Sequence, residues 1–204
     1  MATDPTVIAT VPAECVGCHT PMQSPAYCFG CRRLYPSDSL SIFELFGLPP
    51  RFDLSPDELR EAYLRLTRAV HPDRLSAMSA DDQHSGERLT ARINQGYEVL
   101  GNPIRRAEYL LEFVGGPSAA SDKSVPTDVL AETLEIREEL DEAQARGDVA
   151  AVERIRRQAQ QSFDATRGEI ETLARTLPGD EATRRALRER LNTIKYYERI
   201  LERT

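Results

Sequence analysis

Hydrophobic residues recur every three or four positions through two long stretches of the chain, 40–114 and 127–204. This spacing places apolar side chains on one face of an α-helix, as Leu59, Ala62 and Leu66 illustrate. No stretch sustains the alternation of apolar and polar residues that is typical of a half-buried strand. The pattern therefore predicts an all-α protein.

The first stretch predicts a compact four-helix domain over residues 39–115. Two long helices are expected at 56–69 and about 82–100, with one short helix before them and one after them. The sequence Ser-Pro-Asp-Glu that starts at Ser55 combines a capping box with a proline at the first helical position. Gly-Asn-Pro at 101–103 ends the second long helix.

The second stretch predicts a three-helix bundle over residues 127–204, after a linker at 116–126 that is rich in Gly, Ser and Pro. Its helices are expected at about 127–146, 149–177 and 181–203. Thr127 is the expected N-cap of the first of them.

The four cysteines form two Cys-x-x-Cys pairs near the start of the chain, Cys15 with Cys18 and Cys28 with Cys31. Two such pairs can place four thiolates around one ion at about 2.3 Å, the geometry of structural zinc. A loop-rich segment this short buries little apolar surface, so a bound metal would stabilise it. We therefore predict a zinc module over residues 1–38, with a closed ligand set that favours a structural role over a catalytic one.

Two disulfides, a redox-active pair and a rubredoxin-like iron centre are the alternatives to zinc at these cysteines. Gly17 and Gly30 are expected to let each pair turn sharply, with backbone N–H groups facing the sulfurs. His19 adjoins Cys18, but four ligands are already present, so His19 is expected to be a bystander.

Composition narrows the function classes. The chain has 204 residues and a formal net charge of −7, which makes non-specific nucleic-acid binding an unfavourable main role. No apolar run approaches the length of a membrane helix, and residues 1–14 lack the basic residues of a secretory or mitochondrial leader. We expect a cytoplasmic monomer that binds neither nucleic acid nor membrane.

The tripeptide His71-Pro72-Asp73 interrupts the helical pattern. Proline biases the preceding residue away from helix, so the helix before it is expected to end near Val70. These residues are either an ordinary helix-to-helix loop or a signature that is presented to a partner. The arginines of the preceding helix form a basic side in an acidic protein, or simply a solvated face.

An apolar strip with acidic neighbours is expected on the first helix of the bundle. Leu130 and Leu134 fall beside the core stripe rather than on it, in line with Glu138 and Glu142. An apolar strip rimmed by like charge is a candidate partner site. Tyr196 and Tyr197 are adjacent on the last helix, so only one of them can face the groove beside Leu134.

The segments LREAYLRLTRAVHPDR (59–74) and INQGYEVLGNPIRRAEYL (93–110) resemble the J-domain family. J domains bind ATP-bound DnaK-type chaperones through the basic face of their second helix and the His-Pro-Asp loop, and stimulate ATP hydrolysis. The resemblance implies a chaperone-binding set of His71, Pro72, Asp73, Tyr63, Arg65, Arg68 and Arg74. Leu64 and Ala69 depart from the pattern, because many J domains have basic residues there.

From Ser41 onward the chain resembles one branch of J proteins, the HscB-type co-chaperones of iron–sulfur cluster assembly. IFELFGLPPRFDLS, RRAEYLLEF, LEIREELDEAQARGD and NTIKYYERIL carry this resemblance. It implies that the bundle binds an IscU-like cluster scaffold and delivers it to an HscA-like chaperone. The implied scaffold-binding residues are Leu130, Leu134, Glu135, Glu138, Glu142 and Tyr196.

The sequence therefore predicts an adaptor that carries no catalysis of its own. The alternative is a metal-handling or sensing protein in which Cys15, Cys18, Cys28 and Cys31 receive iron or a cluster. An enzyme is disfavoured, because we find no nucleophile–base pair, phosphate-binding loop or open metal site.

Overall fold

The structure is a computed structural model that describes residues 14–71, 73, 76 and 79–204. The chain divides into two compact units, Met1–Asn102 and Pro103–Thr204, which are described separately below. The described residues form seven helices and no strand, so the all-α prediction is confirmed. Within those residues, no helix is both long enough and apolar enough to span a bilayer.

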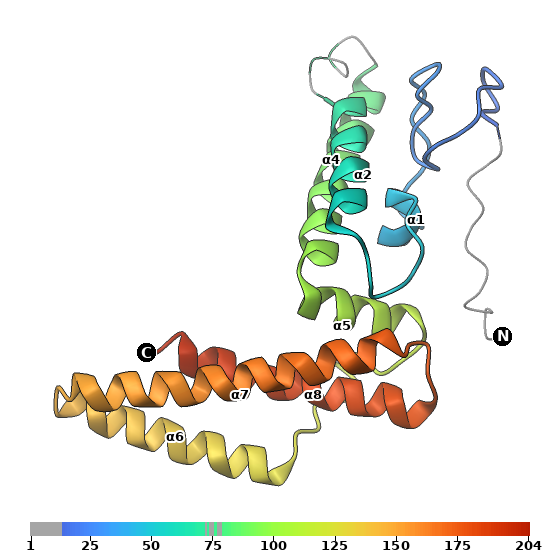
Figure 1. Cartoon of the computed structure of the whole chain (residues 1–204). Coiled ribbons are helices and arrows are strands. Elements are labelled where there is room, and N and C mark those ends of the chain that lie inside the picture. Colours follow the sequence, from blue (N-terminus) through green and yellow to red (C-terminus); the bar gives the residue numbers. More distant parts are fainter. Residues whose placement is uncertain (1–13, 72, 74–75, 77–78) are drawn as a thin grey trace. The chain divides into compact units, whose positions relative to one another are not determined.

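The described residues of the first unit form α1 (Ile42–Phe46), α2 (Pro56–Ala69) and α4 (Ala80–Gly101). Helices α2 and α4 pack side by side, and α1 packs against both of them (Figure 1). Ser41 and Glu44 form a complete capping box at the start of α1. At α2 only half of the predicted box is present, where the Ser55 hydroxyl accepts the backbone N–H of Glu58.

The buried residues of the first unit follow the predicted apolar faces. All three residues used above to illustrate the pattern, Leu59, Ala62 and Leu66, are buried on α2. Helix α2 ends at Ala69 with Val70 as its C-cap, as the Pro72 rule predicts. Ahead of α1, the cysteine segment forms loops with two isolated β-bridges, one of them between Tyr27 and Leu34.

The second unit contains α5 (Pro103–Phe113), α6 (Thr127–Ala145), α7 (Val149–Arg175) and α8 (Glu181–Leu201). Helices α6, α7 and α8 pack as the predicted bundle around buried residues such as Ile136, Ile155 and Ile200 (Figure 1). The expected cap at Thr127 is not formed. Pro126 is the N-cap residue and provides no side-chain hydrogen bond, while Thr127 is already helical.

Helix α5 packs against α7 and α8, so it belongs by its packing to the second unit. The sequence predicts it as the last helix of the preceding domain. The segment predicted as a linker is also held in this unit, because Asn192 Nδ2 donates to the carbonyls of Asp122 (3.1 Å) and Ser124 (3.0 Å). The exact boundaries of the predicted segments remain predictions.

A buried ion pair joins α5 to α8. Arg188 is fully buried, and its Nη2 lies 2.7 Å from Glu108 Oε1. Lys195 Nζ reaches the same oxygen at 3.1 Å, while Glu112 Oε1 lies 3.9 Å from Arg188 Nη1. Burial alone would raise the pKa of Glu108, but the hydrogen bonds from Arg188 and Lys195 outweigh it and hold that pKa below its ordinary value of 4.5.

Replacing Glu108 with Gln should lower the free energy of unfolding by about 3 kcal/mol at neutral pH, because it leaves Arg188 buried without its closest counter-charge. A lowered pKa stabilises the fold above 4.5, and this contribution is lost as the pH falls through the folded pKa. The difference in free energy of unfolding between wild type and Glu108→Gln should therefore become smaller in acid. Urea unfolding followed by circular dichroism measures both effects.

The matched control for this prediction is Glu112→Gln, which removes a more distant and more exposed carboxylate from the same guanidinium. The loss of unfolding free energy in Glu112→Gln should be clearly smaller than that in Glu108→Gln. Equal losses in the two variants would show that the short Glu108 contact has no special weight.

Candidate functional site

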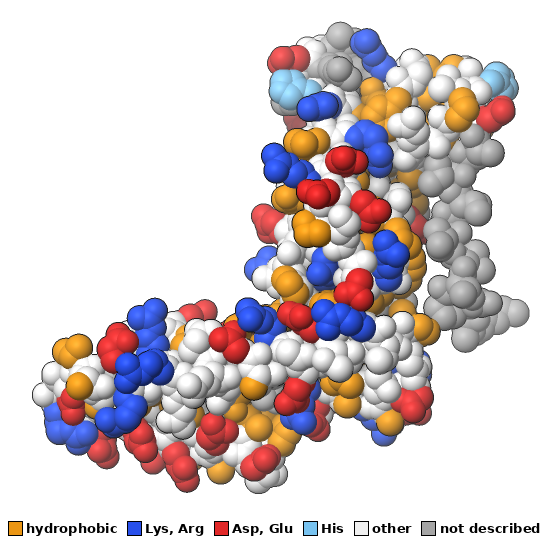
Figure 2. All heavy atoms as spheres, viewed as in Figure 1, with side chains coloured by type: hydrophobic (Ala, Val, Ile, Leu, Met, Phe, Trp, Pro, Cys, Tyr) orange, Lys and Arg blue, Asp and Glu red, His pale blue; other side chains and the backbone are white. Residues whose placement is uncertain are grey.

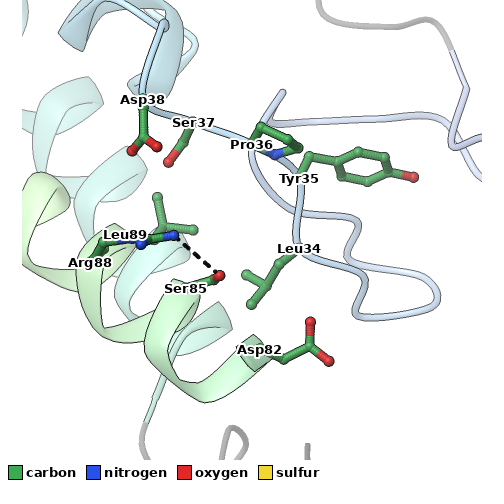
Figure 3. A pocket seen from close by; sticks show the side chains of 9 residues that line it. All are labelled: Leu34, Tyr35, Pro36, Ser37, Asp38, Asp82, Ser85, Arg88 and Leu89. Atoms are coloured by element: carbon green, nitrogen blue, oxygen red, sulfur yellow. Dashed lines mark hydrogen bonds between the residues drawn. The ribbon is translucent and has the colours of Figure 1, made fainter. Parts of the chain in front are cut away.

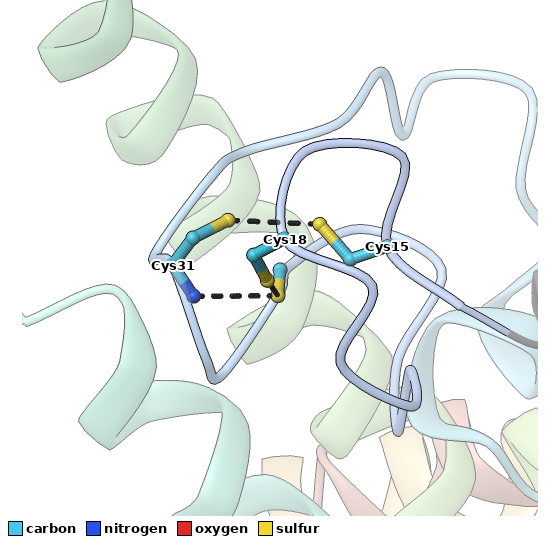
Figure 4. Close-up of side chains that lie close together, drawn as sticks. Cys15, Cys18 and Cys31 are labelled. Carbon is cyan, nitrogen blue, oxygen red and sulfur yellow. Dashed lines mark hydrogen bonds between the residues drawn. The ribbon is translucent and has the colours of Figure 1, made fainter.

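The four cysteines come together in the first unit (Figure 4). Their sulfur atoms all lie within 4.8 Å of one another, and all four thiols are free. The Sγ–Sγ distances of Cys15–Cys31 and Cys18–Cys28 are both 3.6 Å, far longer than a disulfide bond. Ligands about 2.3 Å from a tetrahedral ion stand about 3.8 Å apart, so this spacing fits a four-thiolate metal site.

The two Cys-x-x-Cys pairs repeat one backbone conformation. Cys15 N donates to the carbonyl of Thr20 at 2.9 Å, and His19 N donates to the carbonyl of Cys15 at 2.8 Å. Cys28 forms the corresponding bonds with Arg33 and Arg32, both at 2.9 Å. This repeat presents two sulfurs from each loop to the shared centre.

Gly17 and Gly30 lie in the turns over residues 16–18 and 29–31, as predicted. The left-handed residues are His19 (φ 58°) and Arg32 (φ 65°), which follow the second cysteine of each pair. Gly30 is also needed for space, and Gly17 much less so. A Cβ atom on Gly30 would stand 2.5 Å from Thr20 Oγ1, whereas one on Gly17 would meet only the guanidinium of Arg33, at 3.1 Å.

Polar hydrogens face the sulfurs, as four thiolates require. Gly17 N lies 3.3 Å from Cys15 Sγ, and Cys31 N lies 3.5 Å from Cys28 Sγ. The Tyr35 hydroxyl is 3.0 Å from Cys15 Sγ. Tyr35 was not predicted as part of this site, although its position four residues after the last cysteine is a usable signal.

Hydrogen bonding and burial give the cysteine thiols different pKa values. The bond with Tyr35 is the main reason that the pKa of Cys15 falls to about 6. The Thr20 hydroxyl, 3.2 Å from Cys18 Sγ, lowers the pKa of Cys18. At Cys31 a backbone bond from Arg33 lowers the pKa, but burial and the neighbouring sulfurs raise it to about 11. Thiolates so close together need a cation to be stable at neutral pH, which a bound metal would supply.

His19 stands outside this cluster. Its exposed side chain lies 3.9 Å from Glu14, and the metal-ligand group contains only the four cysteines among the described residues. That His19 is a bystander remains a prediction.

At the end of α2, His71 and Asp73 have exposed side chains that face each other. His71 Nδ1 accepts the backbone N–H of Asp73 at 3.3 Å and lies 3.5 Å from its carboxylate. Pro72 and Arg74, the other predicted residues of this loop, lie outside the described residues.

The other predicted chaperone-binding residues differ in how exposed they are. Tyr63 stacks on Tyr97 of α4 with ring centroids 4.2 Å apart, and Arg65 Nη2 donates to the carbonyl of Phe46 at 3.4 Å. Both are half-buried, whereas Arg68 is exposed. Acidic and basic side chains are interspersed over the visible face of this unit, so the basic residues form no continuous patch there (Figure 2).

On α6, the predicted partner strip is open to solvent. Leu130 and Leu134 are 40% and 55% exposed, although both are large apolar residues. Glu135, Glu138 and Glu142 are exposed beside them on the same helix. The structure thus leaves an apolar strip with acidic neighbours on the surface of the second unit.

Of the two adjacent tyrosines, Tyr197 faces α6. It is buried, and its hydroxyl donates to Glu132 Oε2 at 3.1 Å, while Ser162 of α7 reaches the other oxygen of Glu132 at 3.4 Å. Tyr196 is half-buried, with Arg199 over its ring at 5.8 Å. Glu132 thereby joins the three bundle helices and fixes the rotation of α6 that exposes Leu130 and Leu134.

A small polar pocket lies between the segment after the cysteine loops and α4 (Figure 3). It has a volume of about 270 Å³. It is lined by Leu34, Tyr35, Pro36, Ser37, Asp38, Asp82, Ser85, Arg88 and Leu89. This pocket was not predictable from the sequence, because it depends on how the cysteine segment packs on the helices.

Comparison with known proteins gives two family matches along this chain. Residues 41–109 match the DnaJ domain, and residues 125–204 match the HSCB C-terminal oligomerisation domain. A co-chaperone protein HscB homolog of Chromobacterium violaceum is 38% identical over 132 residues, which is 64% of this chain and 70% of that protein.

Two solved structures are also similar. The chaperone HscB from Vibrio cholerae has a TM-score of 0.64 at 26% identity and covers 80% of this chain and 94% of its own. The crystal structure of the human co-chaperone protein HscB has a TM-score of 0.73 over 93% of this chain and 95% of its own, and at 24% identity it supports the fold alone.

Gly30→Ala should weaken metal binding about tenfold, because the added methyl displaces Thr20 and overpacking of this size costs 1–3 kcal/mol, roughly. Gly17→Ala is the matched control in the other loop, where the flexible end of Arg33 can move aside. Competition with a chromogenic chelator measures both affinities. Equal loss in the two variants would contradict the assigned packing.

Proposed function

Because the chain belongs to the HscB family of co-chaperones, we propose that it is an adaptor of iron–sulfur cluster assembly. It binds the cluster scaffold protein, delivers it to a dedicated DnaK-type chaperone, and stimulates that chaperone's ATPase. The observation that carries this proposal is the succession of a DnaJ domain and an HSCB C-terminal domain in one chain. We further propose that it acts in the cytoplasm as a monomer and catalyses no reaction itself.

The chaperone-binding arm consists of the His71-Pro72-Asp73 loop with Tyr63, Arg65, Arg68 and Arg74. The exposure of His71, Asp73 and Arg68 supports this role, because these side chains are available to a partner. Arginines steer the domain toward an acidic surface. The loop then favours the hydrolysing state of the chaperone by binding that state more tightly.

The scaffold-binding arm consists of Leu130, Leu134, Glu135, Glu138, Glu142 and Tyr196. The exposure of both leucines supports it, since large apolar side chains on a surface helix are good anchors for a partner. The surrounding carboxylates would select a partner with a basic rim. Tyr196 has the weakest support of the set, because its neighbour Tyr197 is the tyrosine that contacts α6.

The cysteine cluster holds zinc in this proposal, and the role of the ion is structural. Four protein ligands leave no open coordination position for water or substrate. The ion would supply the positive charge that keeps four thiolates together and would join the two cysteine loops.

Iron or a cluster at the same cysteines is the second candidate function, since four thiolates also suit iron. This chain would then receive or sense metal rather than act only as an adaptor. Elemental analysis distinguishes the two, because a colourless protein with one zinc ion per chain has no iron site there.

Wild-type protein together with the scaffold should stimulate the chaperone's steady-state ATPase synergistically, and His71→Gln should abolish the stimulation. The scaffold affinity of His71→Gln should be unchanged, because the scaffold-binding residues lie on a different unit. ATPase assays with and without scaffold, and calorimetry with scaffold alone, measure the two properties.

His84→Gln is the matched control, since it removes another exposed histidine from the same unit, 69% exposed at its side chain. It should stimulate as wild type does. Stimulation by His71→Gln at the wild-type level would refute the proposed role of the His71-Pro72-Asp73 loop, and stimulation without scaffold synergy would refute the scaffold as client.

Replacing Leu130, Leu134 and Tyr196 together with Ala should weaken scaffold binding by about 1–3 kcal/mol if they are central anchors. Val149→Ala is the control, because Val149 is equally apolar and 73% exposed on α7 but lies outside the proposed set. Calorimetric titration measures the affinities. An unchanged affinity in the triple variant would mean that the scaffold binds another face.

A further inference from the structure

We propose that the cysteine module forms part of the chaperone-binding surface and does more than stabilise the fold. Phe29, from the second cysteine loop, and α2 enclose a groove that takes an apolar side chain from an acidic surface of the DnaK-type chaperone. This inference rests on the proposed function and assigns to the cysteine module a contact with the partner.

The groove lies within the first unit and has a volume of about 370 Å³. It is lined by Phe29, Glu61, Leu64, Arg65, Arg68 and Ala69. Phe29 is half-buried, and the edge-to-face contact with Tyr27, at 5.1 Å between ring centroids, holds its ring. Every other lining residue comes from the α2 helix that bears the proposed chaperone-binding arginines.

The loop that carries Phe29 is held by its own hydrogen bonds. Cys28 N donates to the carbonyl of Arg33, and Arg32 N donates to the carbonyl of Cys28, both at 2.9 Å. Tyr27, two residues before Phe29, is itself buried. A groove wall that is held in this way is formed before the partner arrives, which lowers the entropic cost of binding.

Three apolar side chains line this groove, Phe29 from the second cysteine loop and Leu64 and Ala69 from α2. Ala69 is buried, whereas Leu64 is 37% exposed despite its apolar side chain. Leu64 is therefore the α2 residue that a partner side chain in the groove would cover. The module thus adds an apolar wall to the helix that bears the proposed chaperone-binding arginines.

The charge around the groove favours an acidic partner. Arg65 and Arg68 line it against the single carboxylate of Glu61, in a chain whose net charge is −7. Both arginines also belong to the proposed chaperone-binding set, so the groove continues that surface. A partner side chain of Leu, Ile or Val size with carboxylates beside it would satisfy both features.

The test is a titration of the chaperone's ATPase with wild-type protein and with Phe29→Ala. The variant should raise the concentration needed for half-maximal stimulation about fivefold, as expected for an interface anchor. The maximal rate should be unchanged, because the His71-Pro72-Asp73 loop is intact. Val16→Ala is the matched control, since Val16 occupies the same position of the first cysteine loop and is 75% exposed outside the groove.

A second variant tests the groove without changing the cysteine module, which Phe29→Ala could disrupt. Leu64→Ala lies on α2, away from the cysteines, and should raise the half-maximal concentration as well. If both residues contact the same partner side chain, the double variant should lose less than the product of the two single losses. Metal content and the affinity for scaffold should match wild type in all of these variants.

Wild-type titration curves for both Phe29→Ala and Leu64→Ala would overturn the inference while leaving the proposed function intact. A change only in self-association, measured by sedimentation, would also overturn it, because a second copy would then be the occupant. Failure of the wild-type protein itself to stimulate the chaperone would overturn the proposed function and this inference with it.

Discussion

The positive charge of Arg188 is buried in the second unit, and a carboxylate has to meet it there because an unpaired buried charge is strongly destabilising. Glu108 provides that carboxylate from α5, and Lys195 shares it. The pair therefore holds α5 on the bundle. One turn further along α8, Asn192 binds the carbonyls of Asp122 and Ser124, so polar contacts from a single helix reach both α5 and the segment before α6.

The helices were predictable because their signals are local. Apolar spacing and turn residues lie within a few positions of the elements that they define, and the α2 end at Ala69 illustrates this. The unit to which α5 belongs was not predictable in the same way. Glu108 and Arg188 are 80 positions apart, and nothing in the periodicity of either helix indicates that they meet. The predicted cap at Thr127 is wrong because the helix begins one residue earlier than expected, so that Thr127 is already helical and Pro126, which has no polar side chain, is the N-cap residue.

The features of the sites also fall into those that local sequence predicts and those that depend on packing. The cysteine cluster follows from the spacing of its ligands, and the exposure of Leu130 and Leu134 follows from their angle to the core stripe. Helical geometry also requires that Tyr196 and Tyr197 point in different directions, but only packing determines which of them meets Glu132. The groove beside Phe29 could not be predicted at all, because it arises where a loop rests on a helix that is distant in sequence.

Because Phe29, Leu64 and Ala69 line one groove, the cysteine module and α2 are not free to evolve separately. Without the module, Leu64, which is 37% exposed even beside it, would lose the wall that Phe29 provides and would be better replaced by a polar or basic residue. A chain that gained the module would gain little from the groove until that position became apolar. Loss or gain of the four cysteines should therefore be accompanied by exchange at one position of a helix that contains none of them.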